Sequence, residues 1–595
     1  MAGRDPGSEY ASRLQTHRRR GEEASQTGDA IGRARLAIAL VAIATAWASL
    51  DAQWFASHWI ALPVGFLAGL VVWHGRVKKR VDRAARLASF YEAGLARIAG
   101  EFRGRGPEGR TYLPADHLYA VDLDLLGEGS LFQLLCLART RHGERNLANW
   151  LLDTAGAGEI VERQGAVAEL CDHLDLREDL ALVGQRSDRA IDADGLVAWG
   201  QRRTARLPAL APISALGASA LTLSALYLFG REAIGSLPLL VAIALQGAVW
   251  MGWRKRVYEA LRGVDQAAAD LGHLSGVLAR VAAEPLTSPR GSALVERLRS
   301  EDGAAGAIGN LRRRVEIHDA ARNLLFAPIA ILLLWPIHGA FWIDRWRGRW
   351  GAAVEGWLDA LGEIEALSSL AGHAFENPDA VFPEIGPEGS GLSAEGLGHP
   401  LLPASGCVRN DVRLDADVGV WVVSGSNMSG KTTLLRAVGT NAVLAMAGGA
   451  VRAHRWRMES FRIGASIRTQ DSLLDGRSRF AAEVERLRGV MDRARDQPPL
   501  LFLLDEILSG TNSHDRRIGA SAVIRGLLDR RAIGLLSTHD LALADLAGES
   551  GTRVANVHFA DRVEDGEMIF DYRLRQGVVD RSNALEIMRA AGLPV

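Results

Sequence analysis

The sequence predicts an α/β nucleotide-binding domain at the C-terminus, preceded by an all-α region that two apolar helical hairpins interrupt. Three observations predict this fold class. A glycine-rich loop lies between an apolar β-branched run and a stretch of helix-forming residues. A second apolar run ends in two carboxylates. Two pairs of apolar stretches in the N-terminal half approach the length of about 20 residues that crosses a bilayer.

The glycine-rich loop has the spacing G-x-x-x-x-G-K-[ST]. Val420–Val423 before it reads as a buried strand, and helix formers without proline run from Leu434 to Met446. Backbone N–H groups of such a loop surround phosphates, and the helix dipole adds positive potential. Lys431 is expected to reach the β- and γ-phosphates, and the Thr432 hydroxyl to bind Mg²⁺. The predicted nucleotide-binding residues of the loop are Gly425, Ser426, Asn427, Met428, Ser429, Gly430, Lys431, Thr432 and Thr433.

Two further apolar runs place polar side chains at strand ends. Pro499–Leu504 leads into Asp505 and Glu506. In a nucleotidase the first carboxylate holds the Mg²⁺ shell, and the second orients and activates the attacking water. Ala532–Thr538 leads into His539. This histidine is either a sensor of the γ-phosphate or a structural residue, and the residues alone leave both interpretations open.

Composition narrows the classes of protein. The 595 residues allow several domains with large cores. A net charge of −1 argues against a protein that coats nucleic acid. Cys136, Cys171 and Cys407 are scattered, without metal-ligand spacing, which indicates ordinary thiols in a reducing compartment.

The apolar hairpins predict membrane spans. The first pairs Leu36–Leu50 with Trp54–Trp73, and the second pairs Leu207–Phe229 with Ile234–Trp253. The basic residues that flank their ends are Arg33, Arg35, Arg76, Lys78, Lys79, Arg80, Arg202, Arg203, Arg206, Arg254, Lys255 and Arg256. By the positive-inside rule these ends lie in the cytoplasm, so we expect a multi-pass protein of the cell (inner) membrane with a cytoplasmic C-terminal domain. Helical hairpins buried in a soluble core are the alternative.

A third apolar run, Leu324–Trp342, is ambiguous. As a fifth span it would place the phosphate loop outside the cell, where there is little ATP. We therefore expect a buried or interfacial helix, and its embedding in the membrane stays open. Gly129–Leu152, taken alone, predicts an amphipathic helix pair with a glycine, Gly143, at the joint.

Several segments together resemble the MutS family of DNA mismatch-repair ATPases. The segments that resemble its ATPase motifs are Gly425–Thr433, Phe461–Ser466, Gly476–Glu483, Leu504–Ser513 and Ser537–His539. His399–Leu401 and Val408–Val412 are similar to the start of that ATPase domain. Gly129–Leu152, with Ile160–Arg163 after it, is similar to the start of the family's helical core and lever region.

The resemblance implies an ABC-like P-loop ATPase that works as a dimer, here a homodimer, with ATP at the subunit interface. It implies that Asp505 binds the metal, that Glu506 acts on the water and that His539 is the switch. It also implies that Asn410 contacts the nucleotide and that Ser478 contacts the nucleotide of the partner subunit. The expected cofactors are ATP and Mg²⁺.

The chain also departs from the family pattern. Cys407 stands where the family has an aromatic residue that stacks on the adenine, so the sequence does not identify the residue that stacks on the adenine here. The mismatch-reading and connector domains have no counterpart in the sequence. The second hairpin stands where the family places its DNA-clamp arm. The resemblance is therefore to a membrane-anchored branch, whose partners would be the lipid bilayer, an unknown protein and DNA without mismatch specificity.

Two other functions compete with a membrane-anchored MutS-like ATPase. An ABC-type transporter with fused membrane and nucleotide-binding domains would fit the total length. Against it, no Leu-Ser-Gly-Gly-Gln-like signature lies before Leu500, and four spans are few for a translocation path. A scaffold with a vestigial ATPase is disfavoured by the intact Lys431, Asp505 and Glu506.

The expected domain division follows from these observations. The predicted segments are a disordered cytoplasmic tail (1–30), a transmembrane hairpin (31–80), the first part of a helical core and lever (81–206), a second transmembrane hairpin (207–254), the second part of the lever (255–390) and the P-loop ATPase domain (391–595).

Overall fold

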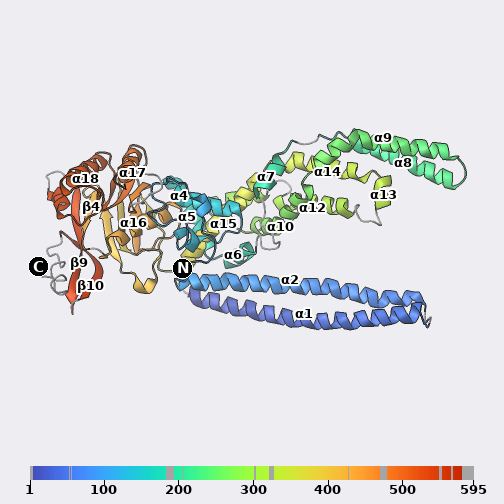
Figure 1. Cartoon of the computed structure of the whole chain (residues 1–595), viewed down its shortest axis with the longest axis horizontal. Coiled ribbons are helices and arrows are strands. Elements are labelled where there is room, and N and C mark those ends of the chain that lie inside the picture. The colour runs from blue at the N-terminus through green and yellow to red at the C-terminus, as the bar shows by residue number, and fades with distance from the viewer. Residues whose placement is uncertain are drawn as a thin grey trace. The chain divides into compact units, whose positions relative to one another are not determined.

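The chain combines a helix-rich N-terminal region with a mixed α/β C-terminal region, as predicted (Figure 1). The computed structural model describes residues 5–52, 54, 56–182, 193–203, 206–299, 303–320, 327–426, 428–468, 479–548, 553–564 and 567–578. The chain forms two compact units. The first unit contains Met1–Leu137, Leu147–Leu174 and Ser369–Val595, and the second contains Ala138–Asn146 and Asp175–Ser368.

A long helical hairpin begins the first unit. Helix α1 (Pro6–Leu50) and helix α2 (Ala61–Ile98) lie side by side, with the short 3₁₀ helix η1 (Ser57–Ile60) after the turn (Figure 1). The carboxylate of Asp5 caps α1 by accepting a hydrogen bond from the backbone N–H of Ser8 at 2.8 Å. This hairpin contains the first predicted pair of apolar runs, and its turn is at Asp51 as expected.

The prediction of a disordered tail over residues 1–30 is wrong for the described residues, because α1 already begins at Pro6. The buried residues at this end of α1 are Pro6, Tyr10, Leu14 and His17. The ring of Tyr10 packs edge-on against Tyr91 of α2, with ring centroids 5.2 Å apart. Further along, a Cβ at Gly21 would lie 3.4 Å from the Cβ of Ala84. Small residues thus form part of the contact face, so the segment lacks the apolar periodicity that predicts a packed helix.

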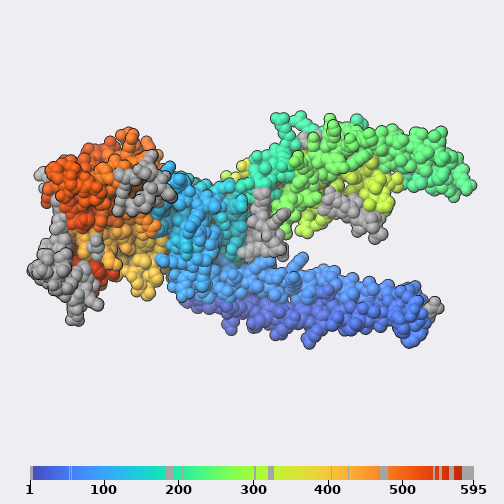
Figure 2. Space-filling model, viewed as in Figure 1, coloured from blue at the N-terminus to red at the C-terminus, as the bar shows by residue number. Residues whose placement is uncertain are grey.

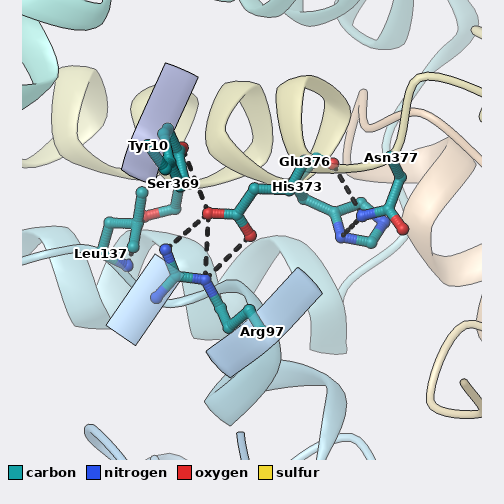
Figure 3. Close-up of polar contacts among 7 residues, drawn as sticks. All are labelled: Tyr10, Arg97, Leu137, Ser369, His373, Glu376 and Asn377. Carbon is teal, nitrogen blue, oxygen red and sulfur yellow. Dashed lines mark hydrogen bonds and ion pairs between the residues drawn. The ribbon is translucent and has the colours of Figure 1, made fainter. Parts of the chain in front are cut away.

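A buried ion pair fixes the base of this hairpin (Figure 3). Arg97 of α2 donates to Glu376, the last residue of helix α15 (Ala353–Glu376), from Nη2 at 2.6 Å and from Nε at 2.9 Å. The Tyr10 hydroxyl donates to the same carboxylate at 3.3 Å. One turn earlier on α15, burial lowers the pKa of His373 to about 4, so this imidazole is neutral at pH 7.

Short helices complete the helical part of the first unit. They are η2 (Arg110–Tyr112), α3 (Leu131–Leu135) and α5 (Ala157–Leu170). Helix α4 (Arg141–Leu152), like α15, contributes residues to both units. The predicted helix pair in Gly129–Leu152 is confirmed as α3 and α4, but Gly143 is not its joint. Gly143 lies inside α4, where an added Cβ would come within 2.9 Å of the Cβ of Ala138.

The second unit is helical throughout its described residues. Its helices besides α4 and α15 are α6 (Leu174–Ala181), α7 (Ala193–Gln201), α8 (Leu210–Gly230), α9 (Ser236–Leu261), α10 (Val264–Ala282), α11 (Pro289–Arg299), α12 (Ala304–Ala320), α13 (Ala327–Leu332) and α14 (Trp335–Trp350). Helices α8 and α9 form the second predicted hairpin, and α14 packs on both. Small residues of α8, such as Ala211 and Ala215, are buried in this contact.

A single helix was expected over Leu324–Trp342, but the described residues of this run do not form one. Its described residues divide between α13 and α14, with Leu334 in the left-handed region at φ 47°. Pro336, in the first turn of α14, lacks the N–H that would continue a preceding helix, which explains the break. The inner face of α14, including Ile337 and Ala340, is buried as expected.

Four helical stretches of the described chain are long and apolar enough to cross a membrane. They are Pro6–Leu50, Ser57–Ile98, Leu210–Gly230 and Ser236–Ala282, which contain the two predicted hairpins. Large apolar side chains on them are exposed, with Leu36 at 67%, Leu216 at 64% and Leu237 at 71%. On the face drawn in Figure 2, the blue side chains of α1 and α2 lie uncovered along the hairpin.

Two sheets form the C-terminal part of the first unit. The six-stranded sheet has the order β10-β9-β4-β8-β7-β6, in which only β10 is antiparallel to its neighbour. Its strands are β4 (Val420–Ser424), β6 (Arg462–Ser466), β7 (Leu500–Asp505), β8 (Ile533–Ser537), β9 (Val554–Glu564) and β10 (Glu567–Gln576). The four-stranded sheet has the order β1-β5-β2-β3, with β1 (Glu384–Ile385), β5 (Arg455–Met458), β2 (Leu392–Leu397) and β3 (Asn410–Leu414).

Helices cover both faces of the six-stranded sheet (Figure 1). They are α16 (Lys431–Met446), α17 (Arg479–Arg493) and α18 (Ser513–Leu528). The 3₁₀ helix η4 (Leu541–Gly548) connects β8 to β9, and η3 (Ala404–Gly406) connects β2 to β3 of the four-stranded sheet. Phe502 and Leu504 of β7 join a core with α17 and α18, whereas Leu503 contacts α16 at Gly439. Successive side chains of a strand point to opposite faces, so β7 is an unbroken apolar run because both faces are buried.

Candidate nucleotide-binding site

The predicted site residues meet at the carboxyl ends of three neighbouring parallel strands. Strand β4 leads into the glycine-rich loop, β7 into Asp505 and Glu506, and β8 into His539. Because β8 lies between β4 and β7, loops far apart in the sequence are brought to one edge of the sheet. Ligands of parallel α/β sheets bind at this edge.

The loop between β4 and α16 depends on its glycines. Gly425 has φ 145° and Gly430 has φ 108°, conformations that residues with a side chain rarely adopt. There is also little room for a side chain at Gly425, because a Cβ there would lie 3.0 Å from the carbonyl oxygen of Phe559. Met428 is 85% exposed at the tip of the loop. Asn427 lies outside the described residues.

Lys431 begins α16 and turns back into the loop. Its Nζ donates to the carbonyl oxygens of Gly425 and Ser426, both at 2.8 Å. Burial lowers the pKa of this ammonium, although the nearby carboxylates, foremost Glu506, oppose the shift. The hydroxyl oxygens of Ser426 and Ser429 are buried without a hydrogen-bond partner among the described residues. A loop with unused polar groups around a cation fits phosphate oxygens.

The side chains of Thr432 and Asp505 form a pair of oxygen donors next to the loop. The Thr432 hydroxyl donates to Asp505 Oδ2 at 2.6 Å, and the Ser537 hydroxyl donates to Oδ1. Mg²⁺ prefers oxygen ligands and is usually held by one or two protein groups together with substrate phosphates, which this pair fits. In the described part of the chain, no group of three or more His, Cys, Asp or Glu side chains is placed to hold a metal ion alone.

Glu506 and His539 face each other beside this pair. His539 Nδ1 lies 3.2 Å from Glu506 Oε1, and the two side chains are 53% and 36% exposed, so water reaches both. Glu506 has φ 46°, and its N–H donates to the carbonyl oxygen of Ser537 at 3.1 Å. A non-glycine residue held at positive φ is over-determined by its surroundings, and such strain is concentrated at functional sites.

Asn410 lies on β3 and binds strand β10. Its amide nitrogen donates to the carbonyl oxygen of Tyr572 at 3.0 Å, and its amide oxygen accepts from the N–H of Leu574 at 2.7 Å. A nucleotide contact by Asn410 stays a prediction. Cys407 accepts a hydrogen bond from the N–H of His399 at 3.3 Å.

Tyr572 was not among the site residues predicted from the sequence. Its side chain lies against the loop, because a Cβ at Gly430 would be 3.3 Å from Tyr572 Cδ1. Tyr572 sits at a register shift in the β9–β10 ladder and has φ 54°. No spacing in the sequence reveals this contact, since it depends on how the C-terminal hairpin bends back over the loop.

The structure therefore brings Lys431, Thr432, Asp505, Glu506 and His539 together. Thr433 is exposed in the first turn of α16. Ser478 lies outside the described residues, so its predicted role across a dimer stays a prediction.

Comparisons with known proteins agree with this geometry. The family model described as MutS domain V matches residues 421–595. The DNA mismatch repair protein MutS of Streptococcus agalactiae is 32% identical over 260 residues, which cover 41% of this chain and 29% of that protein. DNA mismatch repair protein MutS 1 of Halobacterium salinarum is 37% identical over 242 residues, 40% of this chain and 27% of that protein. MutS of Natronomonas pharaonis is 34% identical over 240 residues, with the same coverage of 40% and 27%.

The matched region is less than a third of the length of these relatives. It contains the strands and loops that carry the five residues gathered at the sheet edge. Through this C-terminal region, the chain is similar to the MutS proteins, and residues 421–595 match their domain V.

Proposed function

We propose that this chain is a membrane-anchored, MutS-like ATPase that binds ATP with Mg²⁺ at residues 425–433 and hydrolyses it. One observation carries the proposal: Lys431, the Thr432–Asp505 pair and the Glu506–His539 pair converge at one edge of a parallel sheet. Binding, metal-holding and water-activating groups are thereby within reach of one triphosphate.

Each residue has a distinct role in the proposed reaction. The loop N–H groups and Lys431 neutralise phosphate charge, and Thr432 and Asp505 would hold Mg²⁺. The ion would supply further neutralisation of the phosphate oxygens. Glu506 orients a water molecule and accepts its proton, and His539 positions the Glu506 carboxylate from 3.2 Å.

Dimerisation through the nucleotide face is part of the proposal. An apolar side chain stands exposed at this site, namely Met428 of the loop at 85%. Exposed apolar groups at a functional site are typical of an interaction surface. A homodimer would bring Ser478 of one subunit to the nucleotide of the other.

Replacement of Lys431 by alanine tests the proposed site. Lys431→Ala should weaken ATP binding about 100-fold, since charge-assisted hydrogen bonds to the phosphates contribute about 3 kcal/mol. Titration of the purified protein with a fluorescent ATP analogue measures the dissociation constant. Lys79→Ala, the same change on the exposed surface of α2, is the control. Equal affinities of the two variants would refute the site.

Anchoring by the two hairpins is supported by their length, their exposed apolar side chains and the basic residues at their ends. A water-soluble protein rarely exposes so much apolar surface. With four spans, residues 1–35, 75–206 and 254–595 lie in the cytoplasm, and the turns near Asp51 and Arg231 lie outside.

Cysteine labelling tests this topology. A membrane-impermeant maleimide added to intact cells should label Asp51→Cys and Arg231→Cys, because both turns face outward. Trp350→Cys should be labelled only after the membrane is opened. The natural Cys136 and Cys171 are buried, and Cys407 is partly buried, so their background is low. Outside labelling at position 350 would mean that the segment around Leu324–Trp342 crosses the bilayer.

Coupling to the helical region is the output that we propose. Helix α15 is continuous in the chain from the second unit to Glu376 at the base of the first hairpin, so it is suited to act as a lever. Mismatch repair, the activity in the relatives' names, is not proposed for this chain, because the match spans less than a third of their length.

A further inference from the structure

Residues 117–125, part of the connection between the first hairpin and α3, lie against the α/β domain of the C-terminal region. The carbonyl oxygen of Leu118 accepts a hydrogen bond from the N–H of Ala465 at 3.0 Å, so the segment runs beside the end of edge strand β6. Leu123 and Leu125 of this segment are fully buried. Two aspartates of the same segment bind three arginines of the α/β domain, and they belong to none of the nucleotide-binding motifs.

Asp122 caps the end of β6. Its side chain is 1% exposed, and Oδ1 accepts from the N–H groups of Ile467 at 3.0 Å and Arg468 at 2.6 Å. Oδ2 pairs with the guanidinium of Arg486 on α17. One buried carboxylate therefore joins the strand end to the helix that covers it. Charge-assisted bonds of this kind are the strong ones in a protein interior.

Asp124 holds helix α16, the helix that begins with Lys431 and Thr432. Oδ2 accepts from Arg436 Nη1 at 2.9 Å, and Oδ1 accepts from Arg468 Nη1 at 2.9 Å. Asp124 itself has φ 51°, in the left-handed region that aspartate adopts more often than most residues with a side chain. The Leu123 side chain packs closely on α16 here, because a Cβ at Gly439 of α16 would lie 2.6 Å from Leu123 Cδ2.

We infer that Asp122 and Asp124 are positioning residues for ATP hydrolysis, which fix α16 against the β6–β7 edge of the sheet. The inference rests on the function proposed above. Asp124 connects α16, the helix that carries Lys431 and Thr432, to Arg468, which follows the end of β6. Asp122 connects this end of β6 to α17. Strand β6 pairs in parallel with β7, whose end carries Asp505 and Glu506.

We call the contacts of Asp122 and Asp124 with Arg436, Arg468 and Arg486 the brace. The geometry predicts which kinetic constant depends on it. A triphosphate is held by the loop and α16, so it moves with them when α16 shifts. Glu506 follows β7 in the chain, so it does not move with α16. Binding is then preserved while the water and its base are misaligned, and a misplacement of about 1 Å can cost about 100-fold in rate. Loss of the brace should lower kcat and leave KM nearly unchanged.

The Asp124→Asn variant of the full-length, detergent-solubilised protein tests the brace. It keeps the side-chain size and removes the charge that holds Arg436. We expect kcat to fall at least about tenfold with KM within about twofold of the parent value. The number of ATP-analogue sites per chain corrects kcat for any unfolded fraction. Asp124→Glu, which keeps the charge, should recover part of kcat. Asp116→Asn, an exposed aspartate of the same connection, is the matched control.

Arg436→Gln probes the same contact from the helix. If both variants act through the brace, the double variant loses no more kcat than the more severe single one, whereas independent effects would multiply. An Asp124→Asn kcat equal to that of Asp116→Asn, or multiplicative losses in the double variant, would overturn the inference. In that case Lys431→Ala still loses ATP and the proposed function stands. Wild-type protein that binds no ATP would overturn both.

Discussion

The Glu506→Gln variant should bind ATP as tightly as the parent protein and hydrolyse it about 10²- to 10⁴-fold more slowly, the range that a general base contributes. Glutamine has the shape of glutamate but accepts no proton from water. The groups assigned to binding, Lys431 and Thr432, lie on a different element and keep their contacts. His539 Nδ1 can still meet the side-chain oxygen at the distance of 3.2 Å seen for Glu506.

Single-turnover hydrolysis of labelled ATP, together with the dissociation constant for ATP, separates the two effects. Glu395→Gln, the same change at an exposed position of β2, is the control for the substitution itself. ATP should also accumulate in a closed dimer of Glu506→Gln, which sedimentation velocity in detergent would detect. Undiminished turnover would show that another group activates the water.

The sequence revealed the candidate site because each of its groups belongs to a local pattern. Lys431 and Thr432 follow a strand and begin a helix, and Asp505, Glu506 and His539 each follow an apolar run. The carboxyl ends of parallel strands meet at one edge of a sheet, so spacing along the chain translates into proximity. Thr432 and Asp505, 73 positions apart, therefore lie close enough to form a hydrogen bond.

Contacts between unrelated segments could not be predicted in this way. Asp124 and Arg436 are 312 positions apart, and Arg97 and Glu376 are 279 positions apart. An isolated aspartate or arginine in a polar stretch has many solvated alternatives, and only the folded chain selects its partner. The helical state of residues 6–30 was missed for the same reason, since Tyr10 finds its packing partners on other helices.

The largest effect on stability is expected at the base of the first hairpin, where Glu376 is 3% exposed and its partner Arg97 is 11% exposed (Figure 3). Glu376→Ala leaves the Arg97 guanidinium buried without its carboxylate and also removes the acceptor of the Tyr10 hydroxyl. Removal of one partner of a buried ion pair costs about 3–5 kcal/mol. The docking of α1 and α2 on α15 should weaken by that amount.

Hydrogen exchange of peptides covering Leu87–Ile98 reports this local opening. Glu376→Ala should reduce their protection about 150- to 5,000-fold, which corresponds to the lost free energy. The matched control is Glu92→Ala, which breaks the exposed Arg18–Glu92 pair of the same hairpin, 2.6 Å long and 58% and 46% exposed. Such surface pairs contribute about 0–1 kcal/mol. The double change Arg97→Met with Glu376→Leu should restore much of the protection, because no buried charge is then left alone. Equal losses in Glu376→Ala and Glu92→Ala would mean that the apolar contacts of Tyr10, and not the ion pair, hold the hairpin to α15.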